Sequence, residues 1–491
     1  MPTLRFPSDH ALGDLYWRHR HALHLIDECD DLITDDPWKR LSVAQGPITV
    51  PSDIDVMLSV ALATGQTLAP LADVPPNALY GIDLMHTAID DAALGYLNGL
   101  TGLRELNVSE TRITDAGVAY LQGLDALQNL DLDATTVTDG SMRIIRRLTH
   151  LERLNIIGTN VTHIGLQDVQ ALPALRHLLF DGADHADQKL QSLHGLPALR
   201  TLTVVTGNVT GGGMVIVHTL PHLQGLAFNW MSIRDEGLLS LSTLGGLRRL
   251  ALVGCGLTDS AMPSLRDLLS LRDLDLTYNA IGDGGVAALG SLRKLRALRL
   301  GSTAVGDAGL AHVRALSALE RLDLSNTRIT SGGIPAIATT PALRWLSMSH
   351  TRVDDEGMRH LRDTTALEHL NLHGTTVGDG GLVHVHGLTN LRHLTLAGTT
   401  VTDAGLAHLA HLQSLQSLDL SGTAITESGL SALRDLPHLR ELDLSDTAIS
   451  DDAVQDLIRL PALEEITLSG TAVGTGARDE LDKVLFERQL T

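Results

Sequence analysis

A leucine that returns every 24 residues constrains this chain more than any other feature. The series runs from Leu79 to Leu463 and counts 17 copies without an insertion or a deletion, so the repeats cover residues 79–486 of 491. A period of this kind means that one small unit is built again and again, and that each unit buries its apolar face against its neighbours. The sequence therefore predicts one long solenoid instead of the three globular domains that the length alone suggests.

Each repeat combines two hydrophobic periods. In the copy at residues 391–414, Leu394 and Leu396 alternate with polar or small residues, which indicates a short strand with one buried face. Leu406, Leu409 and Leu412 recur every three residues, which indicates a short helix with one apolar stripe. The expected fold class is α/β, with a parallel sheet on the concave face of an arc and short helices on its convex face.

The polar residues between strand and helix suit structural roles. Position 12 of the unit, such as Thr402, is a residue type that caps helix N-termini. Position 13, such as Asp403, places a carboxylate that caps the helix or faces its positive end. Gly405 at position 15 is expected to permit close approach to the next coil. The many aspartates are therefore interpreted as structural residues and not as catalytic acids.

This pattern resembles the leucine-rich-repeat family, whose signature is LxxLxLxxN/CxL. The second half of the unit is similar to the "ITDxGLxxL" of the ribonuclease-inhibitor-like or cysteine-containing subfamily, as at residues 113–118 and 401–406. The resemblance implies a horseshoe-shaped solenoid. At the Asn or Cys position, 12 of the 17 units carry Thr, in the style of bacterial repeats, whereas one keeps Asn279 and one Cys255. A Thr hydroxyl can still bond the turn backbone, and Cys255 is expected to be a buried structural residue.

Charge and cysteine content limit the partners and the compartment. The formal net charge of −21 disfavours nucleic acid and anionic membranes. Two cysteines form no disulfide framework, and the start of the chain has no apolar leader, so we expect a cytoplasmic location, with signal-independent export as an alternative. We also expect a monomer. No phosphate loop, nucleophile elbow or metal motif stands in a convincing context. The sequence therefore predicts a protein that is not an enzyme and holds no cofactor or metal.

The two ends of the chain depart from the repeat. Within residues 1–78, helical spacing predicts one helix over residues 11–32, and Ser52 with Asp55 predicts a second through Ala63. This segment is expected to be a helical cap for the first repeat or a small docking module. A charged amphipathic helix is expected over residues 478–489 as the second cap, and residues 487–491 are assigned to a C-terminal tail.

Positions 3, 5 and 7 of each unit flank the buried strand leucines and should face the open concave surface. Trp345, His369 and His393 occupy position 3 of three successive units, and His373 occupies position 7 of one of them. Trp and His are good anchors for a protein partner. A metal site is the alternative, but only His369 and His393 converge there, and metal sites want three or four ligands.

Two further zones are candidates for partner contact. The apolar zone spans units four to eight and comprises Ile157, Leu179, Val205 and Val253 at concave positions, with Trp230 and Tyr278 at the adjoining loop edge. Strand propensity alone would also explain these side chains. The acidic zone includes Asp419 and Asp443 on the last inner strands. It would favour a basic segment of a partner, or would serve only solubility.

The sequence thus favours a non-catalytic scaffold that binds a protein partner, with a basic or apolar segment, on its concave face. One alternative is an adaptor, similar to substrate adaptors of ubiquitin ligases, that recruits machinery through residues 1–78, although no F-box pattern is present there. A second alternative is a ligand or metal sensor at His369 and His393.

Overall fold

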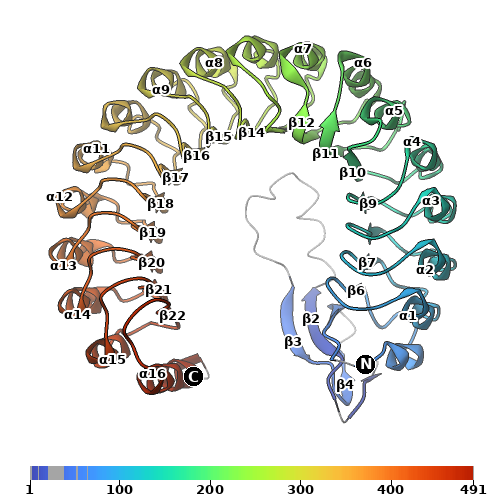
Figure 1. Cartoon of the computed structure of the whole chain (residues 1–491), viewed down its shortest axis with the longest axis horizontal. Coiled ribbons are helices and arrows are strands. Elements are labelled where there is room, and N and C mark those ends of the chain that lie inside the picture. The colour runs from blue at the N-terminus through green and yellow to red at the C-terminus, as the bar shows by residue number, and fades with distance from the viewer. Residues whose placement is uncertain (1–2, 9, 20–37, 51–53, 64, 490–491) are drawn as a thin grey trace. The chain divides into compact units, whose positions relative to one another are not determined.

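The computed structural model describes residues 3–8, 10–19, 38–50, 54–63 and 65–489. The chain divides into two compact units: unit 1 comprises Met1–Ile233 with Gly246–Arg248, and unit 2 comprises Arg234–Gly245 with Arg249–Thr491. In each unit the strands lie on the inner side of the curve and the helices on its outer side (Figure 1). The alternation of short parallel strands and short helices confirms the predicted α/β solenoid.

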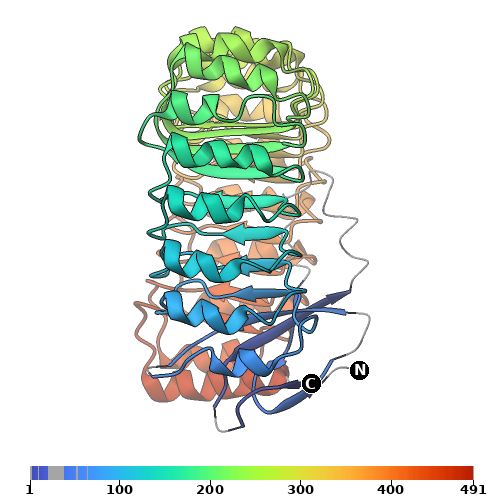
Figure 2. The ribbon, with the colours of Figure 1, turned by 90° about the vertical axis from the view of Figure 1, so that its right-hand side faces the viewer.

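Unit 1 holds the first seven repeat strands. Neighbouring strands pair in parallel, and equivalent positions of successive repeats lie opposite each other, as in Leu106↔Leu130. These strands are β6 (Gly81–Asp83), β7 (Glu105–Asn107), β8 (Asn129–Asp131), β9 (Arg153–Ile156), β10 (His177–Gly182), β11 (Thr201–Asn208) and β12 (Gly225–Ser232). Its helices are α1 (Asp91–Leu94), α2 (Asp115–Val118), α3 (Asp139–Ile145), α4 (His163–Leu166), α5 (Ala186–Gln191) and α6 (Gly211–Met214). Figure 2 shows these helices stacked in a column.

Unit 2 repeats the same arrangement, with Leu370↔Leu394 as an example of its register. Its strands are β13 (Arg249–Val253), β14 (Asp273–Asp275), β15 (Ala297–Arg299), β16 (Arg321–Asp323), β17 (Trp345–Ser347), β18 (His369–Asn371), β19 (His393–Thr395), β20 (Ser417–Asp419), β21 (Glu441–Asp443) and β22 (Glu465–Thr467). Its helices are α7 (Arg234–Leu238), α8 (Asp283–Ala288), α9 (Asp307–Val313), α10 (Ile334–Ile337), α11 (Asp355–Leu361), α12 (Asp379–Leu382), α13 (Asp403–Leu406), α14 (Glu427–Leu430), α15 (Val454–Ile458) and α16 (Thr475–Gln489).

The core of each coil is aliphatic, as the periods predict. Leu396 and Leu406 are fully buried, as are Leu409 and Leu412 of the same coil. Burying one such side chain contributes about 1.5–3 kcal/mol. Since no coil can bury these leucines alone, stacking within a unit is the main source of stability.

The aspartate at position 13 links one coil to the next. Asp379 Oδ1 accepts the backbone N–H of Thr402 at 2.8 Å, and its Oδ2 accepts the Thr402 hydroxyl at 2.6 Å. Asp115 binds Thr138, and Asp139 binds Thr162, in the same way. Thr402 in turn caps α13 by accepting from the backbone N–H of Ala404. The predicted N-cap at position 12 is confirmed, whereas the position 13 carboxylate holds the cap of the following repeat.

The glycine at position 15 makes room for this carboxylate. A Cβ on Gly405 would lie 2.3 Å from Asp379 Oδ1, and one on Gly165 would lie 2.3 Å from Asp139 Oδ1. The close approach predicted for position 15 is therefore real, but these glycines face the preceding coil and not the next one.

The Thr-rich turn is tied by the hydroxyl, as predicted. Thr399 donates to the carbonyl of Leu396, 2.6 Å away within its own turn. Asn279 does more, because its amide oxygen accepts the backbone N–H groups of Cys255 and Leu257 of the preceding coil, each at 3.0 Å. Cys255 is fully buried, as expected, and its Sγ lies 3.6 Å from the carbonyl oxygen of Val253.

The predicted helices of residues 1–78 are wrong wherever the structure describes that segment. It forms strands: β1 (Thr3–Arg5), β2 (Gly13–His19), β3 (Lys39–Val43), β4 (Pro47–Thr49) and β5 (Ile54–Val60). Antiparallel pairs join β1 to β4 and β2 to both β3 and β5, and β5 pairs in parallel with β6 of the first repeat. Residues 20–32 of the first predicted helix lie outside the described residues.

The physical reason for this error lies in the pattern of β5. Ile54, Val56, Leu58 and Val60 alternate along the strand and are buried, and β-branched residues at period two favour a strand. The edge of β6 also needs a partner for its backbone groups, which a helix could not supply. Because β5 continues the sheet of unit 1, this segment covers the first repeat.

Arg18 of β2 contacts aromatic and acidic side chains of the first repeats. Arg18 is only 5% exposed, and its guanidinium lies 4.2 Å from the ring centre of Trp38 and 4.5 Å from that of Tyr80. The same guanidinium donates to Glu105 at 3.4 Å. Stacking on aromatic rings combined with a charge-assisted hydrogen bond suits a buried arginine.

The C-terminal cap is confirmed with one change of boundary. The helix α16 begins at Thr475, three residues before the predicted start, and buries Leu481 and Leu485. Residues 487–489, assigned to the tail from the sequence, continue this helix to Gln489. The α-helical backbone hydrogen bonds simply extend past the last apolar side chain.

Candidate protein-interaction surface

The position 3 side chains of three adjacent strands in unit 2 form one row on the inner face, which we name the ring row: Trp345, His369 and His393. They stand in register, with Trp345 opposite His369 and His369 opposite His393. All three are half-buried, whereas Leu346, Leu370 and Leu394 beside them point into the core. The structure therefore places these residues on the open face, as the period of two predicts.

The two imidazoles of the ring row stack on each other. The ring centres of His369 and His393 are 4.1 Å apart and the ring planes differ by 4°. Burial lowers the pKa of His369 to about 4, assisted by the nearby His393, and burial likewise lowers the pKa of His393. Both rings are therefore neutral at pH 7, and the ring row is an uncharged surface in an acidic protein.

His373 belongs to a different pair. It lies two residues after the end of β18, about 13 Å along the chain from His369, and its ring meets that of His350 edge-on at 4.6 Å. Its Nδ1 donates to the carbonyl of Ala397 at 3.0 Å. The sequence placed His373 in the same zone as the ring row but about 13 Å along its strand from His369, and in the structure its ring contacts that of His350.

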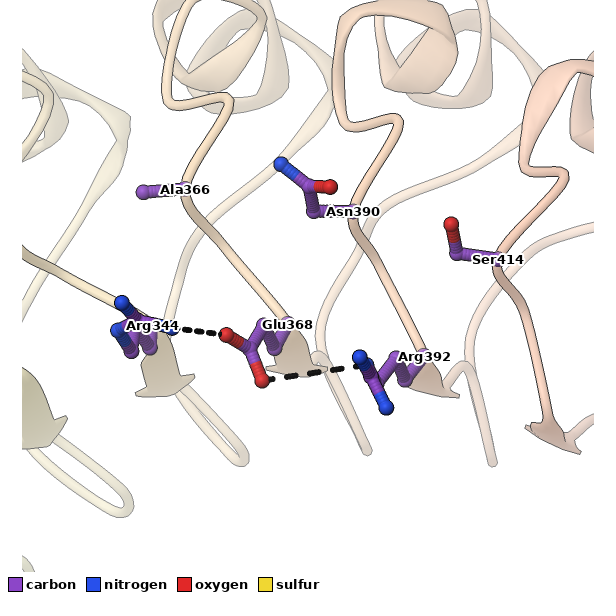
Figure 3. A pocket seen from close by; sticks show the side chains of 6 residues that line it. All are labelled: Arg344, Ala366, Glu368, Asn390, Arg392 and Ser414. Carbon is purple, nitrogen blue, oxygen red and sulfur yellow. Dashed lines mark hydrogen bonds and ion pairs between the residues drawn. The ribbon is translucent and has the colours of Figure 1, made fainter.

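A row of charged side chains borders the ring row, and sequence reasoning missed it. Arg344, Glu368 and Arg392 occupy position 2 of the same three repeats (Figure 3). Glu368 accepts a hydrogen bond from Arg344 and lies 4.0 Å from Arg392 Nε. A hollow of about 250 Å³ opens beside them, lined also by Ala366, Asn390 and Ser414. The available signal was that position 2 alternates between Arg and Glu in these units.

Asp419 and Asp443 of the acidic zone also accept hydrogen bonds from the backbone, a structural role that the sequence did not predict. Asp419 Oδ1 accepts the backbone N–H of Ser421 at 2.9 Å, and Asp443 Oδ1 accepts that of Ser445 at 2.8 Å. Both are half-buried. An Asp or Asn side chain that bonds the backbone two residues on is a common way to start a turn. One oxygen of each carboxylate therefore stabilises the turn that follows the strand.

The apolar zone is divided between the two units. Ile157, Leu179 and Val205 lie half-buried on the inner strands or strand ends of unit 1, where Trp230 is 56% exposed. The remaining two members belong to unit 2, where Val253 is half-buried and Tyr278 is 55% exposed. The residues predicted to form one apolar zone therefore belong to two units, four of them to unit 1 and two to unit 2.

Trp230 and Tyr278 share an unusual backbone conformation. Their φ angles are +58° and +59°, in the left-handed region, at position 8 of the unit. The same conformation recurs at position 8 of other repeats, with glycine in some, such as Gly374 and Gly398, and a non-glycine residue in others, such as Ser302, Asn326 and His350. A bulky aromatic residue in this conformation costs of the order of 1–3 kcal/mol, and the turn of the repeat imposes this conformation whichever residue stands at position 8. The conformation also turns both rings away from the core.

Among the described residues, no group of three or more His, Cys, Asp or Glu side chains could hold a metal ion. Within the same part of the chain, no helix combines the length and the apolar character that a membrane crossing requires.

Family models of the leucine-rich repeat match three stretches, residues 100–121, 268–290 and 413–473. Among curated proteins, none matches the sequence. The fold is similar to solved structures that include the mouse RP105/MD-1 complex, at a TM-score of 0.55 and 17% identity over 86% of this chain and 80% of that chain. A TLR13–ssRNA13 complex matches at a TM-score of 0.51 and 17% identity, over 84% and 73%.

A leucine-rich-repeat protein of Leptospira interrogans matches at a TM-score of 0.43 and 17% identity, over 84% of this chain and 89% of that chain. The 24-residue coils, their parallel inner strands and the three matched stretches lead to the same assignment. The chain carries leucine-rich repeats and folds as a leucine-rich-repeat solenoid.

Proposed function

We propose that the protein is a non-catalytic scaffold that binds a segment of another protein on the inner face of unit 2. The single observation that supports this most is the ring row, Trp345, His369 and His393, held in register and half-exposed. Trp is enriched among the residues that dominate binding energy at interfaces. Leucine-rich repeats commonly serve as protein-binding scaffolds, and the mouse RP105 structure similar to this fold is itself a complex with MD-1.

The bound segment would be apolar where it covers the ring row and basic where it meets the acidic zone. Glu441 and Glu465 are exposed beside Asp443 and favour a basic residue at that end. In unit 1, Ile157, Leu179, Val205 and Trp230 would form a second contact surface, and Val253 with Tyr278 would extend the surface of unit 2. We further propose that the repeats belong to the ribonuclease-inhibitor-like class and that the protein works as a monomer in the cytoplasm, where the buried thiol of Cys255 stays reduced.

The adaptor alternative draws less support from residues 1–78. The described strands of that segment extend the sheet of unit 1, which favours a cap over a separate docking module. Deleting the segment would uncover the edge of β6, so substitutions on its surface are the better test. If Lys39→Glu with Arg40→Glu abolishes recruitment of a second protein while the first partner still binds, the adaptor role holds.

The sensor alternative meets a geometric difficulty. The lone pairs of imidazole nitrogens lie in the ring plane, and the planes of His369 and His393 are nearly parallel with ring centres 4.1 Å apart. Two lone pairs so arranged cannot both point at one ion about 2.1 Å away. The stack would have to open before a metal could bind.

Co-purification with the double variant Trp345→Ala, His369→Ala tests the proposal. We expect loss of the partners that the unaltered protein captures, with a thermal midpoint nearly unchanged, because these side chains are half-exposed. His384→Ala with His408→Ala is the matched control, since both histidines are half-buried on the helical side of unit 2. Equal capture by the two double variants would refute the proposal.

A further inference from the structure

The charged row of Arg344, Glu368 and Arg392 places one carboxylate between two guanidinium groups. Glu368 accepts from Arg344 and lies within ion-pair distance of Arg392. The two arginine side chains are 62% and 53% exposed, so their outer N–H groups face solvent. This leaves one positive charge without a counter-charge at the row, in a chain whose net charge is −21.

The hollow beside this row is small and polar. Its volume is about 250 Å³, and Asn390 and Ser414 add polar side chains to its wall while Ala366 keeps it open. It is below the size typical of pockets for drug-sized ligands, about 300–1,000 Å³, and suits one side chain. Figure 3 shows Glu368 lying between the two arginines, hydrogen-bonded to Arg344 and within ion-pair distance of Arg392. Orientation fixed in advance lowers the entropy lost when an anion binds.

The charged row and the ring row are neighbours in sequence as well as in space. Arg344 directly precedes Trp345, Glu368 precedes His369, and Arg392 precedes His393. An extended peptide advances about 3.3 Å per residue. A residue within one to three positions of the one that covers the rings can therefore reach the hollow.

We propose that the hollow between Arg344 and Arg392 is an anion subsite that takes one side-chain carboxylate of the bound segment. This inference rests on the proposed function, and it specifies the partner further: the segment carries an Asp or Glu within about three residues of the apolar side chain that lies on the ring row. Two arginine forks give bidentate, charge-assisted hydrogen bonds to a carboxylate. The acidic residue and the basic end of the segment would fix the direction in which it crosses the strands.

The charge of the protein favours a carboxylate over a nucleic-acid phosphate. A polyphosphate chain would meet the remaining acidic surface of a protein with net charge −21. A single carboxylate needs only the local positive charge. A phosphorylated side chain is the competing ligand.

The experiment is selection of displayed random 12-residue peptides on the full-length protein, followed by calorimetry on synthetic peptides from the enriched set. We expect an Asp or Glu near an aromatic or large aliphatic residue. The variant Arg344→Ala, Arg392→Ala should weaken these peptides about tenfold or more. Changing the acidic residue of the peptide to its amide should cause the same loss, and the two changes together should cause little more.

Matched variants control for general effects of charge and folding. Arg272→Ala with Arg296→Ala removes two arginines from the same position of other repeats in unit 2, and it should change the affinity less than about twofold. Should the alanine pair lower the thermal midpoint, Arg344→Lys with Arg392→Lys keeps the charges and removes only the forks. It is expected to weaken the peptides by an intermediate amount.

The outcomes separate this inference from the proposed function. Peptides that need Trp345 and His369 but bind equally well after acid-to-amide exchange would overturn the subsite and leave the scaffold intact. A phosphoserine peptide that binds more than tenfold tighter than its Glu counterpart would reassign the hollow to phosphate and also overturn the inference. A selection that yields no peptide dependent on Trp345 and His369 would refute both.

Discussion

At the scale of single residues, the aspartate of position 13 shows how a repeat holds its neighbour. Asp379 accepts both the backbone N–H and the hydroxyl of Thr402 one coil later. Hydrogen bonds to a charged acceptor contribute about 1.5–3 kcal/mol each to stability. The sequence predicted that this carboxylate caps its own helix or faces the positive end of that helix, and spacing alone could not show that it reaches across to the following coil.

The effects of substituting Asp379 and Gly405 on the free energy of unfolding are expected to be coupled. Asp379→Ala should destabilise the protein by about 1–3 kcal/mol, because it leaves the Thr402 N–H without its acceptor. Gly405→Ala should cost a similar amount, because its Cβ would meet the carboxylate at 2.3 Å. Chemical denaturation should show that the double variant loses less than the sum of the two. Asp363→Ala, whose side chain is 82% exposed, is the control and should change stability little.

His369 should make the stability of unit 2 sensitive to acid. Its folded-state pKa of about 4 lies below the ordinary value of 6.5, so the unfolded chain binds the proton first as the pH falls. Stability is therefore full above about pH 6.5 and decreases as the pH drops from there towards 4. Denaturation at a series of pH values should show a smaller decrease for His369→Asn. An unchanged slope for this variant would mean that the stacked pair does not carry the effect.

The placement of the ring row could be predicted from residues alone, since a period of two settles which side chains leave the core. The pairing of His350 with His373, and the charged row of Arg344, Glu368 and Arg392, could not. These contacts join residues of different coils, and they depend on side-chain rotamers and on the lateral spacing of the strands. A repeat pattern gives the position of each Cβ but not the direction of a long side chain beyond it.

At the scale of the element, the side chain at position 9 makes different numbers of hydrogen bonds in different repeats. Thr303 donates only to Leu300 within its own turn, whereas Asn279 bonds three backbone groups of the preceding coil, including the carbonyl of Leu252. The amide side chain has both a donor and an acceptor group, and it is longer than the Thr side chain. The sequence showed the substitution but not that the link to the preceding coil is lost with it.

Asn279→Ala should therefore destabilise unit 2 more than Thr303→Ala does. The first change leaves the buried N–H groups of Cys255 and Leu257 without an acceptor and should cost about 2–5 kcal/mol. The second removes one hydroxyl bond within a turn and should cost about 1 kcal/mol. Urea denaturation followed by circular dichroism measures both. Equal losses would show that the bonds of Asn279 to the preceding coil add nothing.

The N-terminal strands illustrate a limit of short-range pattern reading. Both a helical and a strand period fit parts of residues 11–19, and Ser52 with Asp55 imitates a helix start. Whether this segment forms helices or strands depended on β6, whose edge offers unpaired backbone groups to the segment before it. A contact of this kind lies outside any local window, so the end of the repeats had to be known before the cap could be assigned.

At the scale of the whole molecule, repetition makes the departures from the pattern informative. A period of 24 residues fixes the core and one open face, and the chain as a whole carries a net charge of −21. An uncharged row of rings bordered by paired arginines is therefore unusual within unit 2. The fold of the repeats could be predicted almost fully because one register recurs. The site could be predicted only as a set of positions, since partner binding is a property of what differs between repeats.

Photo-cross-linking in cells is the most direct measurement of the central claim that the ring row is the contact surface. Benzoylphenylalanine replaces Trp345 in one protein and His384, on the helical side, in another. The account predicts a discrete cross-linked partner at position 345 and none at position 384. Adducts that are absent at position 345, or equally abundant at the two positions, would contradict it.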